Sequence, residues 1–266
     1  VTFDIISMQP ITNTAQWLGI WFLWNSHLLC VNLPPMIKER VATVNTQIQD
    51  ACKAAGRNPK EVVLVAVTKT APLEDIQQAI DAGIVHIAEN RVQEAEAKFP
   101  GLLSKNPQLI THIIGHLQTN KAKDAIKAAS FIQSVDSLKL AAEIDKQAAK
   151  LNMTVDILVQ FNTAREEQKF GASPDDPYAL IEAIAQLSHL HIKGLMTMAP
   201  YTEDQGTIRK TFADLRAIKE GASARFKGHS KIDMGIMSMG MSGDYKIAIE
   251  EGSTMVRVGS AIFKNG

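Results

Sequence analysis

The sequence has little or none of several features that mark specialised classes of protein. Its 266 residues include only two cysteines, Cys30 and Cys52, so there is no disulfide framework and a reducing compartment such as the cytoplasm fits. The 28 basic and 28 acidic side chains cancel, which argues against nucleic acid as the main partner. No block of like charge indicates a membrane-surface patch, and no ligand spacing favours a metal site. These absences leave a chain of ordinary globular composition, 45% hydrophobic and 21% charged.

Residues 1–35 differ in composition from the rest of the chain. They hold all three tryptophans, whereas the first basic residue is Lys38. A secretory signal needs basic residues before its apolar segment and a transit peptide needs arginines, so neither is supported. Polar residues also interrupt the apolar run, which is therefore a poor spanning helix, since such a helix needs about 20 mostly apolar residues. We expect an atypical apolar leader here, non-native or disordered, followed by a single domain at 36–266.

From residue 36 the hydrophobic pattern alternates between helical and strand periods. Strands are predicted at 62–68, 84–88, 109–114, 131–135, 154–161, 192–196, 232–236 and 255–258. Helices are predicted at 36–55, 73–82, 91–98, 118–129, 137–151, 177–187, 204–220 and 242–250. Eight strands alternating with helices favour a closed α/β barrel of the (β/α)8, TIM type over an open sheet, with one extra N-terminal helix. The length agrees, because such barrels typically need about 250 residues.

The first predicted strand is the most informative segment. Six apolar residues at Val62–Val67, mostly β-branched, are followed by Thr68 and Lys69. A lysine at the carboxyl end of a buried strand lies where α/β barrels keep their chemistry. We expect burial to lower the pKa of Lys69 and to favour an amine that forms a Schiff base with an aldehyde. The alternative is a lysine that leaves the sheet and extends into water.

The predicted strands seven and eight lead into two loops suited to a phosphate. The first loop contains Ser238, Gly240 and Ser242, and the second contains Gly259 and Ser260. Glycines let the backbone approach closely, while hydroxyls and the free N–H groups of a helix start favour an anion. The alternative is that Ser242 only caps its helix and the glycines only form turns. Two such loops beside a Schiff-base lysine predict a phosphorylated aldehyde as the ligand.

Six motifs in order along the chain carry a family resemblance. They are VAVTK at 65–69, ENRVQE at 89–94, IGHLQTNK at 114–121, GLMTM at 194–198, SMGMS at 238–242 and MVRVGSAIF at 255–263. By these motifs the chain from about residue 37 to 263 resembles the pyridoxal-phosphate homeostasis protein family. That family is a single-domain barrel related to the barrel domain of alanine racemase.

The resemblance implies pyridoxal 5'-phosphate as the cofactor. Lys69 would hold it as a Schiff base, and Asn90 would lie beside it. Further cofactor contacts are implied at Ser238, Met239, Gly240, Gly259 and Ser260, of which the serines and glycines would hold the phosphate. Arg257 would face the pyridine nitrogen. The resemblance assigns no catalytic residue and no metal.

The implied position of Arg257 favours supply of the cofactor over turnover. An arginine stays charged and only donates hydrogen bonds, so it disfavours protonation of the pyridine nitrogen and makes the ring a poorer electron sink. A racemase of this fold also needs an acid–base partner, commonly a tyrosine, and Tyr178, Tyr201 and Tyr245 lie outside the motifs. The resemblance thus implies a cytoplasmic protein of pyridoxal-phosphate homeostasis, which carries or buffers the cofactor for apo-enzymes that receive it.

Two other functions stay open at this point. The chain could be a pyridoxal-phosphate-dependent amino-acid racemase of low activity, or a lysine-dependent aldolase without a bound cofactor. The absorbance of a Schiff base in the purified protein would exclude the aldolase. Assays with a panel of amino acids would separate the racemase from the homeostasis protein.

Overall fold

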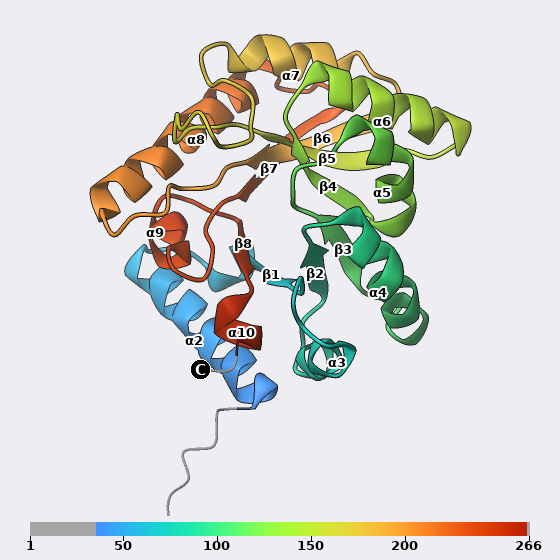
Figure 1. The fold of residues 1–266 in the computed structure, drawn as a ribbon. Coiled ribbons are helices and arrows are strands. Elements are labelled where there is room, and N and C mark those ends of the chain that lie inside the picture. Colours follow the sequence, from blue (N-terminus) through green and yellow to red (C-terminus); the bar gives the residue numbers. More distant parts are fainter. Residues whose placement is uncertain (1–35, 265–266) are drawn as a thin grey trace, which may run out of the picture. The chain divides into compact units, whose positions relative to one another are not determined.

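Short runs of apolar residues form the strands of the molecule, and all of these strands pair in parallel. The computed structural model describes residues 36–264, and within them eight strands close into a barrel in sequence order (Figure 1). The strands are β1 (Val63–Val67), β2 (His86–Glu89), β3 (Ile110–Ile113), β4 (Phe131–Val135), β5 (Val155–Gln160), β6 (Leu190–Met196), β7 (Ile232–Ser238) and β8 (Met255–Val258). The predicted (β/α)8 barrel is confirmed.

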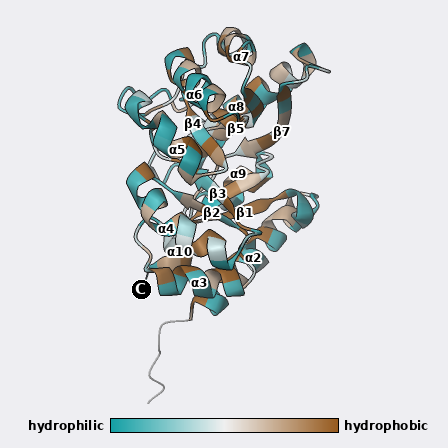
Figure 2. Ribbon diagram, turned by 90° about the vertical axis from the view of Figure 1, so that its right-hand side faces the viewer, coloured by the Kyte–Doolittle hydropathy of each residue, from teal (hydrophilic) through white to brown (hydrophobic). Residues whose placement is uncertain are grey.

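Amphipathic helices surround the barrel and bury their apolar stripes against it (Figures 1 and 2). They are α2 (Ile37–Ala54), α3 (Leu73–Asp81), α4 (Val92–Lys105), α5 (Ala122–Ala128), α6 (Leu138–Lys150), α7 (Pro177–Ala185), α8 (Gln205–Arg225), α9 (Tyr245–Glu250) and α10 (Ser260–Phe263). Two short 3-10 turns are η1 (Pro59–Glu61) and η2 (Thr119–Lys121). Because α2 precedes β1, the predicted extra N-terminal helix is confirmed.

Helix α2 ties the last two helices to the barrel. It packs against α9 and α10, which lie beside it in Figure 1. The Arg40 guanidinium donates to the carbonyl oxygens of Ile262 and Lys264 at 3.3 and 3.0 Å, at the end of α10. The Tyr245 hydroxyl at the start of α9 bonds to Gln47. The extra helix therefore fixes the segment that follows β8, where a phosphate is predicted to bind.

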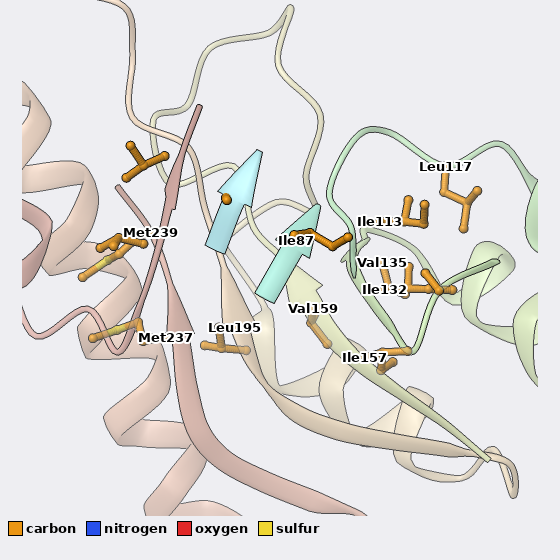
Figure 3. Packing of buried hydrophobic residues seen from close by; sticks show 14 of the residues in the cluster. Ile87, Ile113, Leu117, Ile132, Val135, Ile157, Val159, Leu195, Met237 and Met239 are labelled. Atoms are coloured by element: carbon orange, nitrogen blue, oxygen red, sulfur yellow. The ribbon is translucent and has the colours of Figure 1, made fainter. Parts of the chain in front are cut away.

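The apolar core is divided by the barrel wall. A large cluster lies between the strands and the helices; Figure 3 shows part of it, including Ile87, Ile132 and Met239. Inside the barrel the apolar clusters are small, and one of them joins Val65, Ala88, Ile114 and Met255. Such interiors are usually filled by branched apolar side chains. Here polar side chains occupy much of that space, and they matter for the site.

Helix α4 is longer than predicted. The prediction ended it at residue 98, whereas it continues to Lys105 with Pro100 inside it. A proline interrupts the helical hydrogen bonds and costs about 3 kcal/mol in a helix interior. Phe99 and Leu102 on either side are buried, and fully burying such side chains contributes about 1.5–3 kcal/mol each, which offsets that cost.

Other boundaries also differ from the prediction. Strand β7 runs on to Ser238, so this serine ends a strand and does not lie in the following loop. Helix α9 begins at Tyr245, not at Ser242, and Asp244 takes its N-cap position. Strand β6 begins at Leu190 and α8 ends at Arg225, against the predicted 192 and 220. The helix predicted at 118–129 divides into η2 and α5.

The expectation of an apolar leader at 1–35 lies outside the described residues. From residue 36 to 264, no helix is both long enough and apolar enough to cross a membrane. The same residues contain no group of three or more His, Cys, Asp or Glu side chains placed to hold a metal ion. Cys52 is buried as a free thiol.

Candidate functional site

Three of the predicted ligand-binding segments, Lys69, Asn90 and Gly259–Ser260, follow the carboxyl ends of three neighbouring strands. Strand β1 lies between β8 and β2, with Val67 paired to Ala88 and Ala66 paired to Val258. The ladder ends at Thr68, whose N–H donates to the Ala88 carbonyl oxygen, and Lys69 follows it in a turn. On the other side Gly259 lies against β1, because a Cβ atom there would be 3.1 Å from the Val67 carbonyl oxygen. Closure of the barrel by pairing of β1 with β8 thus brings residues from both ends of the domain to the carboxyl ends of the strands, here called the barrel mouth.

Lys69 lies in a turn beyond β1, and its side chain is exposed. The expected burial of the amine is therefore wrong, because burial of the strand ends at Thr68, which has no exposed surface. Within residues 36–264 no hydrogen bond or ion pair engages the Lys69 ammonium. The amine is consequently accessible to an aldehyde.

A buried ion pair holds the turn that carries Lys69. Lys98 Nζ on α4 donates to Glu89 Oε1 and to the Thr68 carbonyl oxygen, both at 2.8 Å. The Thr68 hydroxyl donates to the same carboxylate oxygen at 2.7 Å. Burial raises the pKa of Glu89, and the hydrogen bonds from Lys98 and Thr68 oppose that rise. The pair fixes the backbone immediately before the lysine, and sequence reasoning missed Lys98 altogether.

Asn90 borders a pocket of about 550 Å³ at the ends of β2 and β3. Arg91, Glu94 and Lys121 also line this pocket, so its wall contains two cationic side chains and one carboxylate. Gly115 lets the two strand ends approach, because a Cβ atom there would lie 2.2 Å from the Asn90 carbonyl oxygen. Asn90 is exposed, so its side chain is available to a ligand beside Lys69.

Arg257 carries its charge into the barrel without an ion-pair partner among residues 36–264. Its Nη1 donates to Ser238 Oγ at 2.7 Å and its Nη2 to the Thr197 carbonyl oxygen at 2.9 Å. Burial lowers the pKa of Arg257 to about 10, and the charge of Asp244 opposes this shift, so the guanidinium stays charged at pH 7. A buried cation held only by neutral oxygens, with N–H groups to spare, fits a ligand that presents an acceptor to it.

The Ser238 hydroxyl points into the barrel and forms its hydrogen bonds there. Ser238 has no exposed surface, accepts from Arg257 and donates to Gln133 Oε1 at 2.7 Å. Its single hydrogen would have to leave Gln133 before this hydroxyl could donate to a phosphate, whereas the bond that it accepts from Arg257 could stay. The phosphate contact assigned to Ser238 by the resemblance stays a prediction, and the geometry gives the side chain a different set of partners.

The junction of β8 and α10 presents converging donors. The backbone N–H groups of Gly259 and Ala261 both donate to Ser242 Oγ, at 3.3 and 3.4 Å. These distances exceed the usual 2.9–3.0 Å, so the bonds are weak. Ser260 begins α10 and is exposed. One oxygen of an anion could take the place of the serine oxygen here, since the donors already point to a single position.

Ser242 was predicted as part of the first phosphate loop, but it was not among the cofactor contacts that the resemblance implies. The alternative in which it only caps the helix that follows is wrong, because Asp244 occupies the N-cap position of α9. The Asp244 side chain accepts from the Met241 N–H. A carboxylate at this helix start disfavours a second anion there, so the geometry favours the β8–α10 junction over the β7–α9 loop.

Gly240 and Met239 are placed by packing. Gly240 has a φ of +96°, and a Cβ atom there would lie 2.6 Å from Ala248 Cβ and 2.8 Å from Tyr245 Cα. This glycine therefore lets the backbone approach α9, a different role from the expected approach to a phosphate. Met239 is fully buried in the outer apolar cluster (Figure 3). The structure does not bring its side chain to the mouth.

The three tyrosines are not arranged around Lys69. Tyr245 turns its hydroxyl to α2, as described above, and Tyr178 lies on α7 with the Arg225 guanidinium 5.9 Å from its ring. Tyr201 follows β6 and is fully exposed. An acid–base pair of the kind that a racemase requires is therefore not assembled from tyrosines among residues 36–264.

The chain is similar to known proteins in sequence and in fold. Residues 42–265 match the family model "Alanine racemase, N-terminal domain". The pyridoxal phosphate homeostasis protein of Aquifex aeolicus is 38% identical over 225 residues, covering 85% of this chain and 96% of the relative. The protein of the same name from Pasteurella multocida is 36% identical over 227 residues, again covering 85% and 96%. Both names describe homeostasis and no catalysed reaction.

One of the similar solved structures is that of PipY from Synechococcus elongatus with PLP bound. It has a TM-score of 0.74 to this chain at 34% sequence identity. The match covers 86% of this chain and 100% of PipY.

We predict that Lys98→Met destabilises the protein by about 3–5 kcal/mol at pH 7, because it leaves the Glu89 carboxylate buried without its partner. The loss should be smaller at pH 5, where that carboxyl can take up a proton. Urea unfolding measures both values. Lys105→Met on the same helix is the control, since Lys105 is exposed and its loss should change stability by no more than about 0.5 kcal/mol. Equal losses in the two variants would contradict a stabilising role for the buried Lys98–Glu89 ion pair.

A second prediction concerns the loss of stability at acid pH that is caused by His112. Burial, and next to it the charge of His86, lower the pKa of His112 to about 3 from an ordinary 6.5. Between these values the unfolded chain binds a proton at His112 that the folded protein does not bind. Stability should therefore fall as the pH falls below 6.5, by up to about 1.4 kcal/mol per pH unit from this group. Urea unfolding from pH 7 to pH 4 should show a shallower slope for His112→Gln. His229→Gln removes an exposed histidine and should keep the parent slope; a His112→Gln slope equal to it would refute the assignment.

Proposed function

Because the chain belongs to the pyridoxal phosphate homeostasis protein family, we propose that it binds pyridoxal 5'-phosphate as a Schiff base on Lys69. We further propose that it carries or buffers the cofactor inside the cell for apo-enzymes that receive it. The observation that carries the proposal is the free, exposed amine of Lys69 after the carboxyl end of β1, the strand that lies between β2, which leads to Asn90, and β8, which leads to the β8–α10 junction.

The surroundings of Lys69 suit each part of the cofactor. The aldehyde carbon can meet the Lys69 amine, and the clamp of Lys98 on Thr68 keeps the lysine's backbone in one place. The phosphate fits the junction where the N–H groups of Gly259 and Ala261 converge. In this arrangement the Ser242 hydroxyl gives up those N–H groups and donates to the phosphate.

Arg257 supplies the ring contact in this proposal. Its free N–H groups can donate to the pyridine nitrogen, which must then act as an acceptor and stay unprotonated. Bound pyridoxal phosphate supplies an electron-withdrawing ring, and it withdraws electrons best when that nitrogen is protonated. Arg257 thus weakens the chemistry that a racemase uses, and the positions of the tyrosines point the same way. We propose binding and release without turnover.

An exposed lysine also suits exchange of the cofactor. A Schiff base is broken by water or by another amine, and both need access to its carbon atom. The Lys69 side chain lies at the open end of the barrel and no packed side chain covers its amine. The cofactor can therefore be handed on without opening the fold.

The attachment site is tested by reduction with borohydride in the presence of pyridoxal phosphate. We expect the cofactor to be fixed on the peptide that contains Lys69, as read by mass spectrometry. Lys69→Ala should fold normally, because the side chain makes no contact in the core, and should lose the visible absorbance of the Schiff base. Lys121→Ala, which removes another lysine near the mouth, should keep it. Label found mainly on a lysine other than Lys69 would overturn the assignment.

The phosphate position is tested by comparing pyridoxal phosphate with pyridoxal. Hydrogen bonds to a charged group contribute about 1.5–3 kcal/mol, so Ser242→Ala should weaken binding of the phosphorylated form by roughly tenfold or more. The same substitution should leave the affinity for pyridoxal unchanged. Titration of the Schiff-base absorbance measures both affinities. Ser223→Ala on α8 is the matched control. Equal losses for the two ligands would place the phosphate elsewhere.

A further inference from the structure

A continuous line of side-chain hydrogen bonds runs through the barrel from Arg257 to the amino end of β2. Arg257 bonds to Ser238, and Ser238 bonds to Gln133, both at 2.7 Å. Gln133 Nε2 lies 3.0 Å from His112 Nδ1, and His112 Nε2 lies 3.0 Å from His86 Nδ1. The five residues come from five different strands, and only Arg257 has been given a contact with the cofactor in the proposed function.

The arginine fixes the direction of this line. A guanidinium can only donate, so Ser238 Oγ must accept from it, and the serine hydrogen is free to go to Gln133 Oε1. The amide nitrogen of Gln133 then faces His112, and it also lies 3.2 Å from Met255 Sδ, a weak acceptor. The opposite orientation of the amide would turn its oxygen toward the sulfur and would leave the serine hydrogen without an acceptor in the described part of the chain.

The direction continues through both histidines. Because Gln133 donates to Nδ1 of His112, the neutral ring must carry its hydrogen on Nε2 and donate to His86 Nδ1. His112 is fully buried, and its ring packs against Phe131 with the ring centres 5.3 Å apart. The lowered pKa described above keeps this ring neutral at pH 7. A neutral ring has two tautomers, and the line selects one of them.

We infer that Gln133 and His112 are positioning residues for Arg257, which they hold through Ser238 in a one-way hydrogen-bond chain. The inference rests on the proposed function, in which Arg257 meets the pyridine nitrogen. Each member of the chain has one orientation only, because reversing a link would either leave a hydrogen without an acceptor or set two like groups against each other. Within residues 36–264 the guanidinium is therefore held in place through four other side chains and not by an ion pair.

The inference is tested first on the full-length protein without cofactor, by nitrogen-15 NMR of the imidazoles at pH 8. The parent should show His112 as the single tautomer with its hydrogen on Nε2. Gln133→Glu is the decisive variant, because a carboxylate accepts from Ser238 and from His112 alike. It should reverse His112 to the tautomer with its hydrogen on Nδ1, while a packing role for residue 133 predicts no reversal.

Ser238→Ala cuts the chain beside Arg257 and provides a second variant. Removing one hydrogen bond from the one-way hydrogen-bond chain should raise the minor tautomer of His112 to at least about one tenth of the population. Arg57→Gln is the control, since Arg57 also donates to backbone carbonyl oxygens but is not a member of the hydrogen-bond chain. The inference would be overturned if His112 carried its hydrogen on Nδ1 in the parent protein. It would also be overturned if the tautomer of His112 were unchanged in both Gln133→Glu and Ser238→Ala.

The link to the cofactor is tested separately with Gln133→Leu. This substitution leaves Ser238 without an acceptor and should weaken pyridoxal-phosphate binding by between about threefold and tenfold, with a shift in the absorbance of the bound cofactor. Unchanged affinity and spectrum would show that Arg257 needs no positioning. If the parent does not bind pyridoxal phosphate, the proposed function fails, while the NMR result still decides whether the chain is one-way.

Discussion

Arg257 brings a positive charge into a closed barrel, and much of the interior is arranged around that charge. Desolvation of an ion is expensive unless hydrogen bonds or a counter-ion replace the lost water. No carboxylate among residues 36–264 forms an ion pair with Arg257; Ser238 and the Thr197 carbonyl oxygen bond to it instead. Apolar side chains alone could not accept those hydrogen bonds, so the barrel interior contains polar residues where similar barrels use branched apolar ones.

Three segments at the barrel mouth are each held by hydrogen bonds from a different part of the fold. The turn before Lys69 is held from α4 by Lys98, and the α10 segment is held from α2 by Arg40. The β8 segment is held from inside the barrel through Arg257. A ligand that touches all three segments is thus bound by groups whose positions were fixed before it arrived, which reduces the conformational entropy lost on binding.

The sequence was informative wherever a signal is local. Apolar β-branched runs predicted the eight strands, and the rule that barrel sites lie at carboxyl strand ends predicted where Lys69 would lie. Its exposure was not predictable, because the pattern that marks a buried strand does not tell how far burial continues beyond it. Pro100 inside α4 was missed because burial of Phe99 and Leu102, a tertiary effect, outweighs a local rule.

Contacts between distant residues form the larger share of what the sequence could not reveal. Ser238 and Gln133 are 105 residues apart, so no local pattern joins them. The roles of Ser238 and Ser242 depend on one strand end: because β7 continues to Ser238, its hydroxyl points into the barrel, whereas Ser242 reaches the β8–α10 junction. A motif matched as one block therefore divides into a serine that accepts from Arg257 inside the barrel and a serine that accepts from two backbone N–H groups at the β8–α10 junction.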